Sequence, residues 1–353
     1  MTLAVIGASG SIGRAITHMI VAERLLDSRH TLMLVGNEAG KSAKSLYGLS
    51  EDIRDAYAEI CPQIEVVLNE EELDAEYIIM AGSAPARHPD QVHDRDHLAA
   101  LNYQLFDQYA GAIARNGHGH EIVVCVSNPV ELAVFVFAKH LGRRRVVGMG
   151  AFLDSLRFRK ELSLDLEIDR NLIHAFMAGE HGSLMVPLWS SVHAYGMGDD
   201  EVAAAIQRMR RGHLTVHFAQ DFSEASGQLK ELIHAGQIRQ AYAFVETYPP
   251  DLRVALRPLV TQFSGAKTIA GTARATLNLL RMVMLGHDAL ISGQICLEGD
   301  CYGLHGAVGV PFVIGNKGVD RYIEMRLWPE ELEMLQHAAE RIRQKYQGVG
   351  PDY

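Results

Sequence analysis

The chain has 353 residues, of which 48% are apolar and 22% are charged, a balance typical of an ordinary globular protein. Dividing the length by about 150 residues per domain predicts roughly two domains. Lys and Arg number 33 against 43 Asp and Glu, and the formal net charge of −10 argues against non-specific binding to nucleic acid or to an anionic membrane. Any bound anion must therefore be held by a local site.

The sequence predicts neither a targeting segment nor a membrane span. Residues 1–7 lack a basic region and enter a strand pattern directly, and no apolar run approaches the roughly 18 residues of a spanning helix. The four cysteines, Cys61, Cys125, Cys296 and Cys301, form no CxxC pair, and we expect Cys125 to be a buried free thiol. These features favour the reducing cytoplasm.

Residues 1–148 alternate between short apolar runs and helical stretches such as 12–26 and 97–114. The apolar runs predict strands at 3–6, 31–35, 64–68, 77–81, 122–126 and 146–147. Continuously apolar strands separated by helices indicate a parallel sheet covered on both faces. This half is therefore predicted to be a doubly wound α/β domain.

Residues 149–353 have a different texture, and we expect them to form a second, mixed α+β domain that carries the substrate site. Longer helices are predicted at 155–166, 223–245, 271–286 and 329–346. Strands are predicted at 291–297, 309–314 and 322–327, with the turn 315–318 separating the last two.

A glycine-rich loop follows the first predicted strand and opens the first helix. It reads Gly7-Ala8-Ser9-Gly10-Ser11-Ile12-Gly13, a GxxGxxG spacing. Glycines let the backbone approach a pyrophosphate, and the helix N-terminus offers free N–H groups and a positive dipole. A tight strand–helix turn without a ligand gives the same pattern, but the position favours dinucleotide binding by Gly7, Ser9, Gly10, Ser11, Ile12 and Gly13.

The end of the second predicted strand bears on the choice of cofactor. An NAD-binding unit usually carries Asp or Glu there, bonded to the ribose hydroxyls, whereas this chain has Gly36. Without that charge a 2′-phosphate is not repelled, and Asn37, Lys41 and Ser42 could donate to it. Alternatively, Glu38 takes over the ribose and NAD is used. The pattern favours NADP slightly over NAD.

Four further motifs lie far apart in the sequence. They are Arg95-Asp96-His97-Leu98 leading to Asn102, Ser127-Asn128-Pro129-Val130-Glu131, Leu153-Asp154-Ser155-Leu156-Arg157-Phe158-Arg159 and Gly179-Glu180-His181-Gly182. Each alone is more typical of a solvated helix or a plain turn. Together, in this order, they resemble the L-lactate/L-malate dehydrogenase family over nearly the whole chain, and within it the malate branch with a GASGxxG loop. That branch often uses NADP.

The resemblance implies a Rossmann-type nucleotide domain and a set of site residues. His181 would be the proton donor and acceptor, with Asp154 holding its imidazole and raising its pKa. Arg157 would clamp the substrate carboxylate, Arg95 would polarise the C2 oxygen, and Asn128 would orient substrate and nicotinamide. The resemblance also places Gly82, Asn102, Val126 and Asn128 beside the cofactor.

The segment 82–95 departs from the family at most positions, and it is the segment that sets substrate choice. Arg87 is the candidate for binding a second substrate carboxylate. Alternatively, Arg87 is a solvated charge and His88 or His93 faces the substrate. The start of a substrate-wall helix near Lys267 and Thr268 also departs from the family's patterns.

The sequence therefore predicts an NADP- or NAD-dependent oxidoreductase for a 2-hydroxy acid/2-oxo acid pair, with (S)-malate/oxaloacetate preferred. Lactate or a larger 2-hydroxy acid is the alternative substrate, and a non-catalytic dinucleotide sensor is the alternative of another class. His213 and His217, spaced i, i+4 on an expected helix, could hold zinc but lack a third ligand, so no metal is predicted. Family members are usually homodimers or homotetramers.

Overall fold

The computed structural model describes residues 1–38, 42–84, 95–265 and 267–349, and of 95–98 it describes the backbone alone. In the N-terminal half, parallel strands lie in the order β3-β2-β1-β4-β5-β6. This order is that of a doubly wound nucleotide-binding sheet. The strands are β1 (Thr2–Ile6), β2 (Thr31–Val35), β3 (Gln63–Val67), β4 (Tyr77–Met80), β5 (Ile122–Cys125) and β6 (Val146–Gly148).

Helices connect these strands, and each predicted strand is confirmed to within one or two residues. The helices are α1 (Ser11–Ala22), α2 (Ser42–Ala56), α3 (Arg95–Asn116) and α4 (Val130–Leu141), with short 3-10 turns at Glu70–Glu72 and Arg143–Arg145. The strands bury apolar side chains on both faces, as covered parallel strands do. Cys125 is buried and has a free thiol, as predicted.

The second half continues the same sheet with antiparallel strands. β9 pairs with β6 at Gly148 and Gln294, and the order continues β9-β10-β7-β8, with β11 on β10. The strands are β7 (Ile173–Gly179), β8 (Met185–Ala194), β9 (Ala289–Glu298), β10 (His305–Gly315) and β11 (Gly318–Tyr322). A boundary at residue 148 stays a prediction, since the sheet crosses it.

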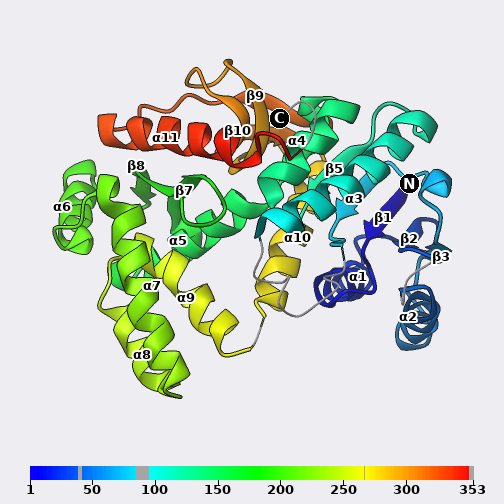
Figure 1. Ribbon diagram of the computed structural model, residues 1–353, viewed down its shortest axis with the longest axis horizontal. Coiled ribbons are helices and arrows are strands. Elements are labelled where there is room, and N and C mark those ends of the chain that lie inside the picture. Colours follow the sequence, from blue (N-terminus) through cyan, green and yellow to red (C-terminus); the bar gives the residue numbers. More distant parts are fainter. Residues whose placement is uncertain (39–41, 85–94, 266, 350–353) are drawn as a thin grey trace.

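Helices of the second half form a separate group at the lower left of Figure 1, except for α10, which lies beside α1, and α11. They are α5 (Gly150–Leu166), α6 (Asp199–Arg210), α7 (Phe218–His234), α8 (Ile238–Glu246), α9 (Pro250–Phe263), α10 (Ile269–Met284) and α11 (Pro329–Tyr346), with 3-10 turns at Arg170–Leu172 and Thr215–His217. A second hydrophobic cluster packs α5, β7 and β8 against α6–α9.

Two predicted elements of this half are wrong. The helix expected at 223–245 is two helices, α7 and α8, because Gly236 adopts a φ of +72° that ends α7. The strand expected at 322–327 runs instead from Gly318 to Tyr322. Gly318 starts it directly after the turn, with a φ of +91° and so close to the Arg144 carbonyl that a Cβ would lie 2.2 Å from that oxygen.

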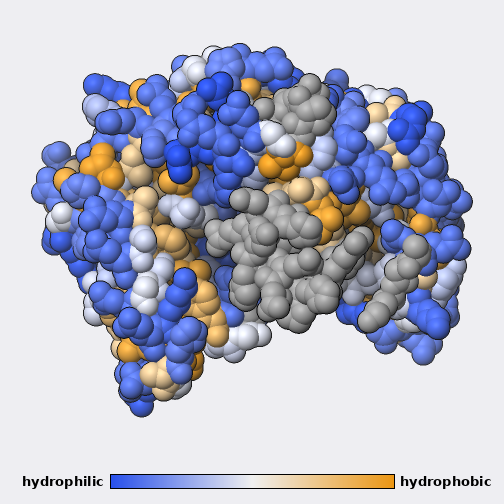
Figure 2. Space-filling view, in the orientation of Figure 1, coloured by the Kyte–Doolittle hydropathy of each residue, from blue (hydrophilic) through white to orange (hydrophobic). Residues whose placement is uncertain are grey.

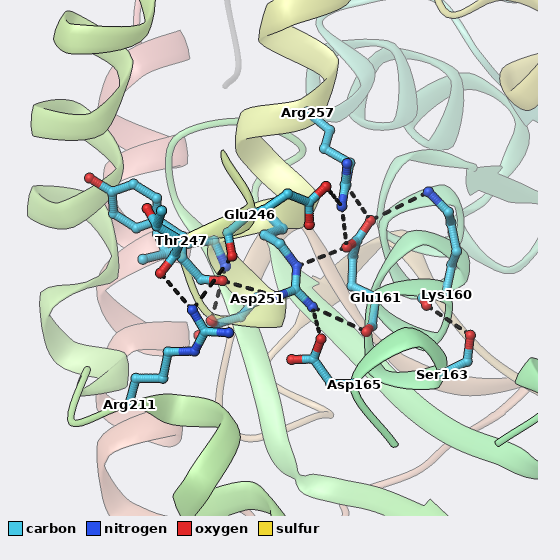
Figure 3. A network of polar contacts seen from close by, with 12 residues as sticks. Lys160, Glu161, Ser163, Asp165, Arg211, Glu246, Thr247, Asp251 and Arg257 are labelled. Carbon is cyan, nitrogen blue, oxygen red and sulfur yellow. Dashed lines mark hydrogen bonds and ion pairs between the residues drawn. The ribbon is translucent and has the colours of Figure 1, made fainter. Parts of the chain in front are cut away.

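A buried network of charged side chains ties α5 to α9 (Figure 3). Glu161 of α5 accepts from Arg253 Nε at 2.9 Å and from Arg257 Nε at 2.7 Å, and Arg253 also donates to Asp165 at 2.7 Å. Burial alone would raise the pKa of Glu161, but hydrogen bonds and charges from Arg257 and its other cationic neighbours hold that pKa below its usual value. The network fixes the C-terminal half of α5 against the helical group.

Hydrophilic residues cover most of the face drawn in Figure 2, and hydrophobic ones appear there in small groups. No helix of the part that the structure describes is long and apolar enough to cross a membrane.

Candidate active site

The glycine loop between β1 and α1 is closed by close backbone contacts. Gly7 has a φ of +81°, and a Cβ on it would lie 2.5 Å from the Cα of Gly82, which follows β4. A Cβ on Gly13 would lie 2.2 Å from the Gly7 carbonyl oxygen. Only glycine fits at these two positions, so the sequence motif is required by the loop's own packing.

The N-terminus of α1 opens onto this loop. Its N-cap residue, Gly10, has no side chain to cap the helix, and its N–H donates to the Gly7 carbonyl at 3.0 Å. By helix geometry the N–H groups of Ser11, Ile12 and Gly13 have no partner inside the helix. This end is therefore built to receive an anion, and the bare glycine cradle fits the pyrophosphate of a dinucleotide.

At the end of β2, Gly36 faces the start of α2. A Cβ there would lie 2.5 Å from Leu46 Cδ1 and 3.1 Å from Ser42 Oγ, so a side chain at 36 would displace α2 residues. Ser42 Oγ accepts from the Asn37 N–H at 3.0 Å and donates to the Asn37 carbonyl at 2.8 Å. The structure thus brings Gly36, Asn37 and Ser42 together, whereas Lys41 lies outside the described residues.

The loop between β7 and β8 carries His181, and it brings the imidazole to α5. His181 Nδ1 lies 2.7 Å from Asp154 Oδ2, and Arg157 Nη1 donates to Asp154 Oδ1 at 3.1 Å. Asp154 and Arg157 are i, i+3 on α5 and so share one face of that helix. Asp154 is 1% exposed, whereas His181 and Arg157 are each 20% exposed. The carboxylate is therefore buried beneath two side chains that are partly exposed.

Electrostatics in this cluster favour a protonated imidazole. Burial alone lowers the pKa of His181, but the charge of Asp154 and its hydrogen bond outweigh burial, and the pKa is raised above its ordinary value. Arg157 opposes this rise, and Glu131 adds to it. A carboxylate bonded to one ring nitrogen also leaves Nε2 as the nitrogen that exchanges protons.

Asn102 and Asn128 lie at the carboxyl ends of the central strands. Asn102 Nδ2 donates to the Asn128 carbonyl at 2.9 Å, and its Oδ1 accepts from the Ala84 N–H at 2.8 Å. Asn102 is buried and joins the segment after β4 to the segment after β5, whereas the Asn128 side chain is exposed. Val126, whose N–H bonds to the Met80 carbonyl at 2.9 Å, is buried at the same edge.

Two predicted substrate residues cannot be placed from the structure. Arg87 lies outside the described residues, as do His88 and His93. Arg95 is the first residue of α3, but its side chain is among those not described.

Sequence reasoning missed Glu131 and Gln294 as residues of this site. Glu131 Oε1 accepts the His181 backbone N–H at 2.7 Å, and Gln294 Nε2 donates to the same oxygen at 3.3 Å. Glu131 closed the motif 127–131 but was given no role there, and its charge within the apolar run of α4 was a further signal. Gln294 gave no signal, because its partners are 143 and 163 residues away.

The expectation that His213 and His217 lie i, i+4 on one helix is wrong. His213 precedes the 3-10 turn that ends at His217, so the two do not share a helix, and His213 Nδ1 bonds to Asp221 at 2.8 Å. Within the described ranges no group of three or more His, Cys, Asp or Glu side chains is placed to hold a metal.

Comparison with known proteins agrees with this geometry. Residues 1–148 match the model of the lactate/malate dehydrogenase NAD-binding domain. The malate dehydrogenase of Methanothermobacter thermautotrophicus is 26% identical over 97% of this chain and 95% of its own length. The L-lactate dehydrogenase 2 of Clostridium acetobutylicum is 24% identical over 98% of this chain and 97% of its own.

Residues 1–148 therefore carry the NAD-binding domain of the lactate/malate dehydrogenase family, and the chain as a whole is similar to malate and L-lactate dehydrogenases, which are NAD-dependent oxidoreductases. The family resemblance and the α/β fold predicted from the sequence are thus confirmed. Malate dehydrogenase from Plasmodium falciparum has the same fold, with a TM-score of 0.74 at 19% identity over 99% of this chain and 98% of that one. Lactate dehydrogenase from Cryptosporidium parvum, solved with lactic acid and nicotinamide adenine dinucleotide, also gives 0.74, at 20% identity over 100% and 98%.

Proposed function

We propose that this dehydrogenase reversibly reduces a 2-oxo acid to the 2-hydroxy acid, with oxaloacetate and (S)-malate as the preferred pair. The observation that carries the proposal is the contact of His181 Nδ1 with buried Asp154, whose other oxygen binds Arg157. The proposed proton donor, His181, and the proposed carboxylate-binding cation, Arg157, thus both bind the buried carboxylate of Asp154. A non-catalytic dinucleotide sensor has no use for such an acid–base pair.

In the proposed reduction, the chain's own residues bind the acid and move one proton. Arg157 uses one N–H on Asp154 and offers the others to the substrate carboxylate, a two-point contact that suits a guanidinium. His181 Nε2 gives its proton to the C2 oxygen as negative charge grows there, and the Asp154 carboxylate stabilises the imidazolium before transfer. Bound reduced nicotinamide supplies the hydride that C2 accepts.

Asn128 and Arg95 complete the proposed substrate site. Asn128 stands at the carboxyl end of β5, where ligands of doubly wound sheets bind, and we assign it the orientation of substrate and nicotinamide. Arg95, at the start of α3, is assigned to the C2 oxygen.

Dinucleotide binding is assigned to the glycine loop, and NADP is proposed slightly ahead of NAD. Gly36 leaves no carboxylate to repel a 2′-phosphate, and Ser42, Asn37 and Lys41 are the proposed donors to it. A relative in Methanocaldococcus jannaschii, 25% identical over 97% of both chains, is named L-2-hydroxycarboxylate dehydrogenase (NAD(P)(+)). Turnover measured with NADPH and with NADH at the same substrate concentration tests the preference for NADP. A large preference for NADH would reverse it.

Lactate or a bulkier 2-hydroxy acid is the second candidate substrate, because relatives named L-lactate dehydrogenase match as much of the chain as those named malate dehydrogenase. Arg87 is the proposed selector of a second carboxylate. The test is a panel of oxaloacetate, pyruvate and longer 2-oxo acids, run with wild type and Arg87→Gln. Loss confined to oxaloacetate supports Arg87, and unchanged preference removes it from the role. If no 2-oxo acid causes oxidation of reduced nicotinamide although the cofactor binds tightly, the result favours a non-catalytic dinucleotide sensor.

We also propose that the protein is a homodimer or homotetramer, as members of the family usually are. Light scattering of the purified chain measures the subunit number, and a monomer at micromolar concentration would contradict it. The four free cysteines support a reducing, cytoplasmic location.

A further inference from the structure

Behind the His181 pair, two buried polar side chains from distant segments contact each other. Glu131 lies on α4 and Gln294 on β9, and the Gln294 Nε2 donates to Glu131 Oε1 at 3.3 Å. Glu131 is 2% exposed and Gln294 is not exposed at all. Buried polar groups are costly unless they are hydrogen-bonded, so their partners are the key to their role.

Each of the two side chains holds the backbone of a segment that carries site residues. Glu131 Oε1 accepts the N–H of His181 at 2.7 Å. Gln294 Oε1 accepts the N–H of Ala151 at 3.0 Å, in the first turn of α5. The N-cap of α5, Met149, gives no side-chain hydrogen bond, so this first-turn N–H is one that α5 itself cannot satisfy. Gln294 therefore caps the helix that carries Asp154 and Arg157.

Three glycines let the main chain close around the Gln294 side chain. A Cβ on Gly148 would lie 2.8 Å from Gln294 Cβ, and one on Gly150 would lie 3.0 Å from its Oε1 and 2.6 Å from His181 Cβ. A Cβ on Gly309 would lie 3.4 Å from Gln294 Nε2 and 2.8 Å from Ala151 Cβ. Because β6, α5 and β10 all pack this tightly around it, the Gln294 amide is held in one position.

We propose that Glu131 and Gln294 are positioning residues that hold the three proposed substrate-binding and catalytic segments in one frame. The frame joins Asn128, three residues before Glu131, to α5 through Gln294 and to the His181 loop through the Glu131 carboxyl. Both side chains are buried, so we assign them no contact with substrate. The inference rests on the proposed function, since the frame matters only if those segments act together.

Charged groups surround this frame from several elements. Asp154 and Arg157 of α5 face His181, and Glu180 stands next to it in the chain, paired with Lys345 of α11 at 2.6 Å. Burial first, and Glu180 second, raise the pKa of Glu131, which favours its neutral form. What the proposal requires of Glu131 is an acceptor oxygen, not a charge.

The test compares Glu131→Leu, Glu131→Gln and Gln294→Met. Glu131→Leu leaves the His181 N–H unpaired, and the resulting displacement of the imidazole is expected to lower kcat about 10- to 100-fold. Affinity for reduced nicotinamide, measured by fluorescence, stays at the wild-type value. Glu131→Gln keeps an acceptor and restores most of kcat. Gln294→Met lowers kcat like Glu131→Leu, and it decides the matter if Glu131→Leu does not fold.

A second readout needs neither cofactor nor substrate. The NMR titration of His181, assigned by loss of its signal in His181→Asn, moves to lower pH in Gln294→Met, because the ring loses its contact with Asp154. Gln294 is the diagnostic position for this readout, since removal of the Glu131 carboxyl lowers the pKa of His181 by itself. Glu331 provides the matched control: it is also fully buried and accepts the Ser190 N–H at 2.9 Å, but it caps α11. Glu331→Leu alters stability alone, with the His181 titration and kcat per folded molecule unchanged.

The outcomes separate this inference from the proposed function. Wild-type kcat and an unmoved His181 titration in folded Glu131→Leu or Gln294→Met overturn the positioning role. The positioning role is also overturned if Glu331→Leu changes kcat and the His181 titration as much as Glu131→Leu and Gln294→Met do. A wild-type enzyme that oxidises no reduced nicotinamide with any 2-oxo acid defeats the proposed function, whereas the titration still reports on the frame.

Discussion

Replacing Asp154 by asparagine keeps the size of the side chain and removes its charge. Asp154 is 1% exposed, it meets His181 Nδ1 at 2.7 Å and it binds Arg157 at 3.1 Å. A hydrogen bond to a charged group contributes about 1.5–3 kcal/mol, which corresponds to roughly 10- to 100-fold in rate. Because the carboxylate is buried, we expect a loss in kcat for 2-oxo acid reduction near the upper end of that range.

The pH dependence of the rate should also shift in a defined direction in Asp154→Asn. Burial lowers the pKa of His181, and Asp154 is the main group that raises it, so the pKa falls when the charge is removed. In the proposed mechanism, reduction needs protonated His181. As the pH rises, the rate of reduction is therefore expected to begin its decline at a lower pH in Asp154→Asn than in wild type. Oxidation of the hydroxy acid needs neutral His181, so its rise with pH also begins earlier.

The assay follows absorbance of reduced nicotinamide in both directions across the neutral and alkaline range. Cofactor affinity is the internal control, because the glycine loop is untouched. Rates within a few-fold of wild type, with pH profiles that coincide, would refute the assignment of Asp154 as the partner that tunes His181.

Three further predictions concern binding and stability. Gly13→Ala places a Cβ 2.2 Å from the Gly7 carbonyl, so it should lower the free energy of unfolding by about 1–3 kcal/mol and weaken cofactor binding, and an unchanged Tm and affinity would contradict this. Arg253→Met removes one of the two arginines that pair with buried Glu161 and leaves Arg257 as the other, so it should cost about 1–3 kcal/mol in denaturant unfolding, whereas a loss below about 0.5 kcal/mol would mean that the network is dispensable. Since the pKa of His181 is raised from 6.5, its contribution to stability is complete below that value and is lost as pH rises through the folded pKa; a His181→Asn variant with the same alkaline loss would argue against it.

Local pattern was sufficient for the elements whose burial is uniform. The strands of the first half other than β3, which contains exposed Gln63 and Glu65, carry largely apolar runs, and α11 matches its predicted range of 329–346. The β7–β8 hairpin was not predicted as strands, because both of its strands are buried over most of their length and show no alternation. Its importance lies in the loop it makes, which carries His181 to α5.

The candidate site divides in the same way. The His181, Asp154 and Arg157 motifs could be found from the sequence because their residue types are dictated by the proposed chemistry. Gln294 could not, because a buried glutamine 143 residues from Ala151 is defined only by the fold that joins β6 to β9. Positions that hold a site together thus leave weaker traces in sequence than positions that react.

The charges of the described site bear directly on the choice of substrate. With His181 protonated, Arg157 and His181 contribute two positive charges beside the carboxylate of Asp154, and burial raises the pKa of the neighbouring Glu131. The remaining positive charge matches one substrate carboxylate. A dicarboxylate such as oxaloacetate brings a second, and desolvating it without a partner would be strongly unfavourable. Arg95 is already assigned to the C2 oxygen, so we propose that malate specificity depends on a further cation and that Arg87, in the segment 85–94, supplies it. If Arg87→Gln left oxaloacetate preferred over pyruvate, that charge would have to come from elsewhere, and Arg95 would be the next arginine to replace.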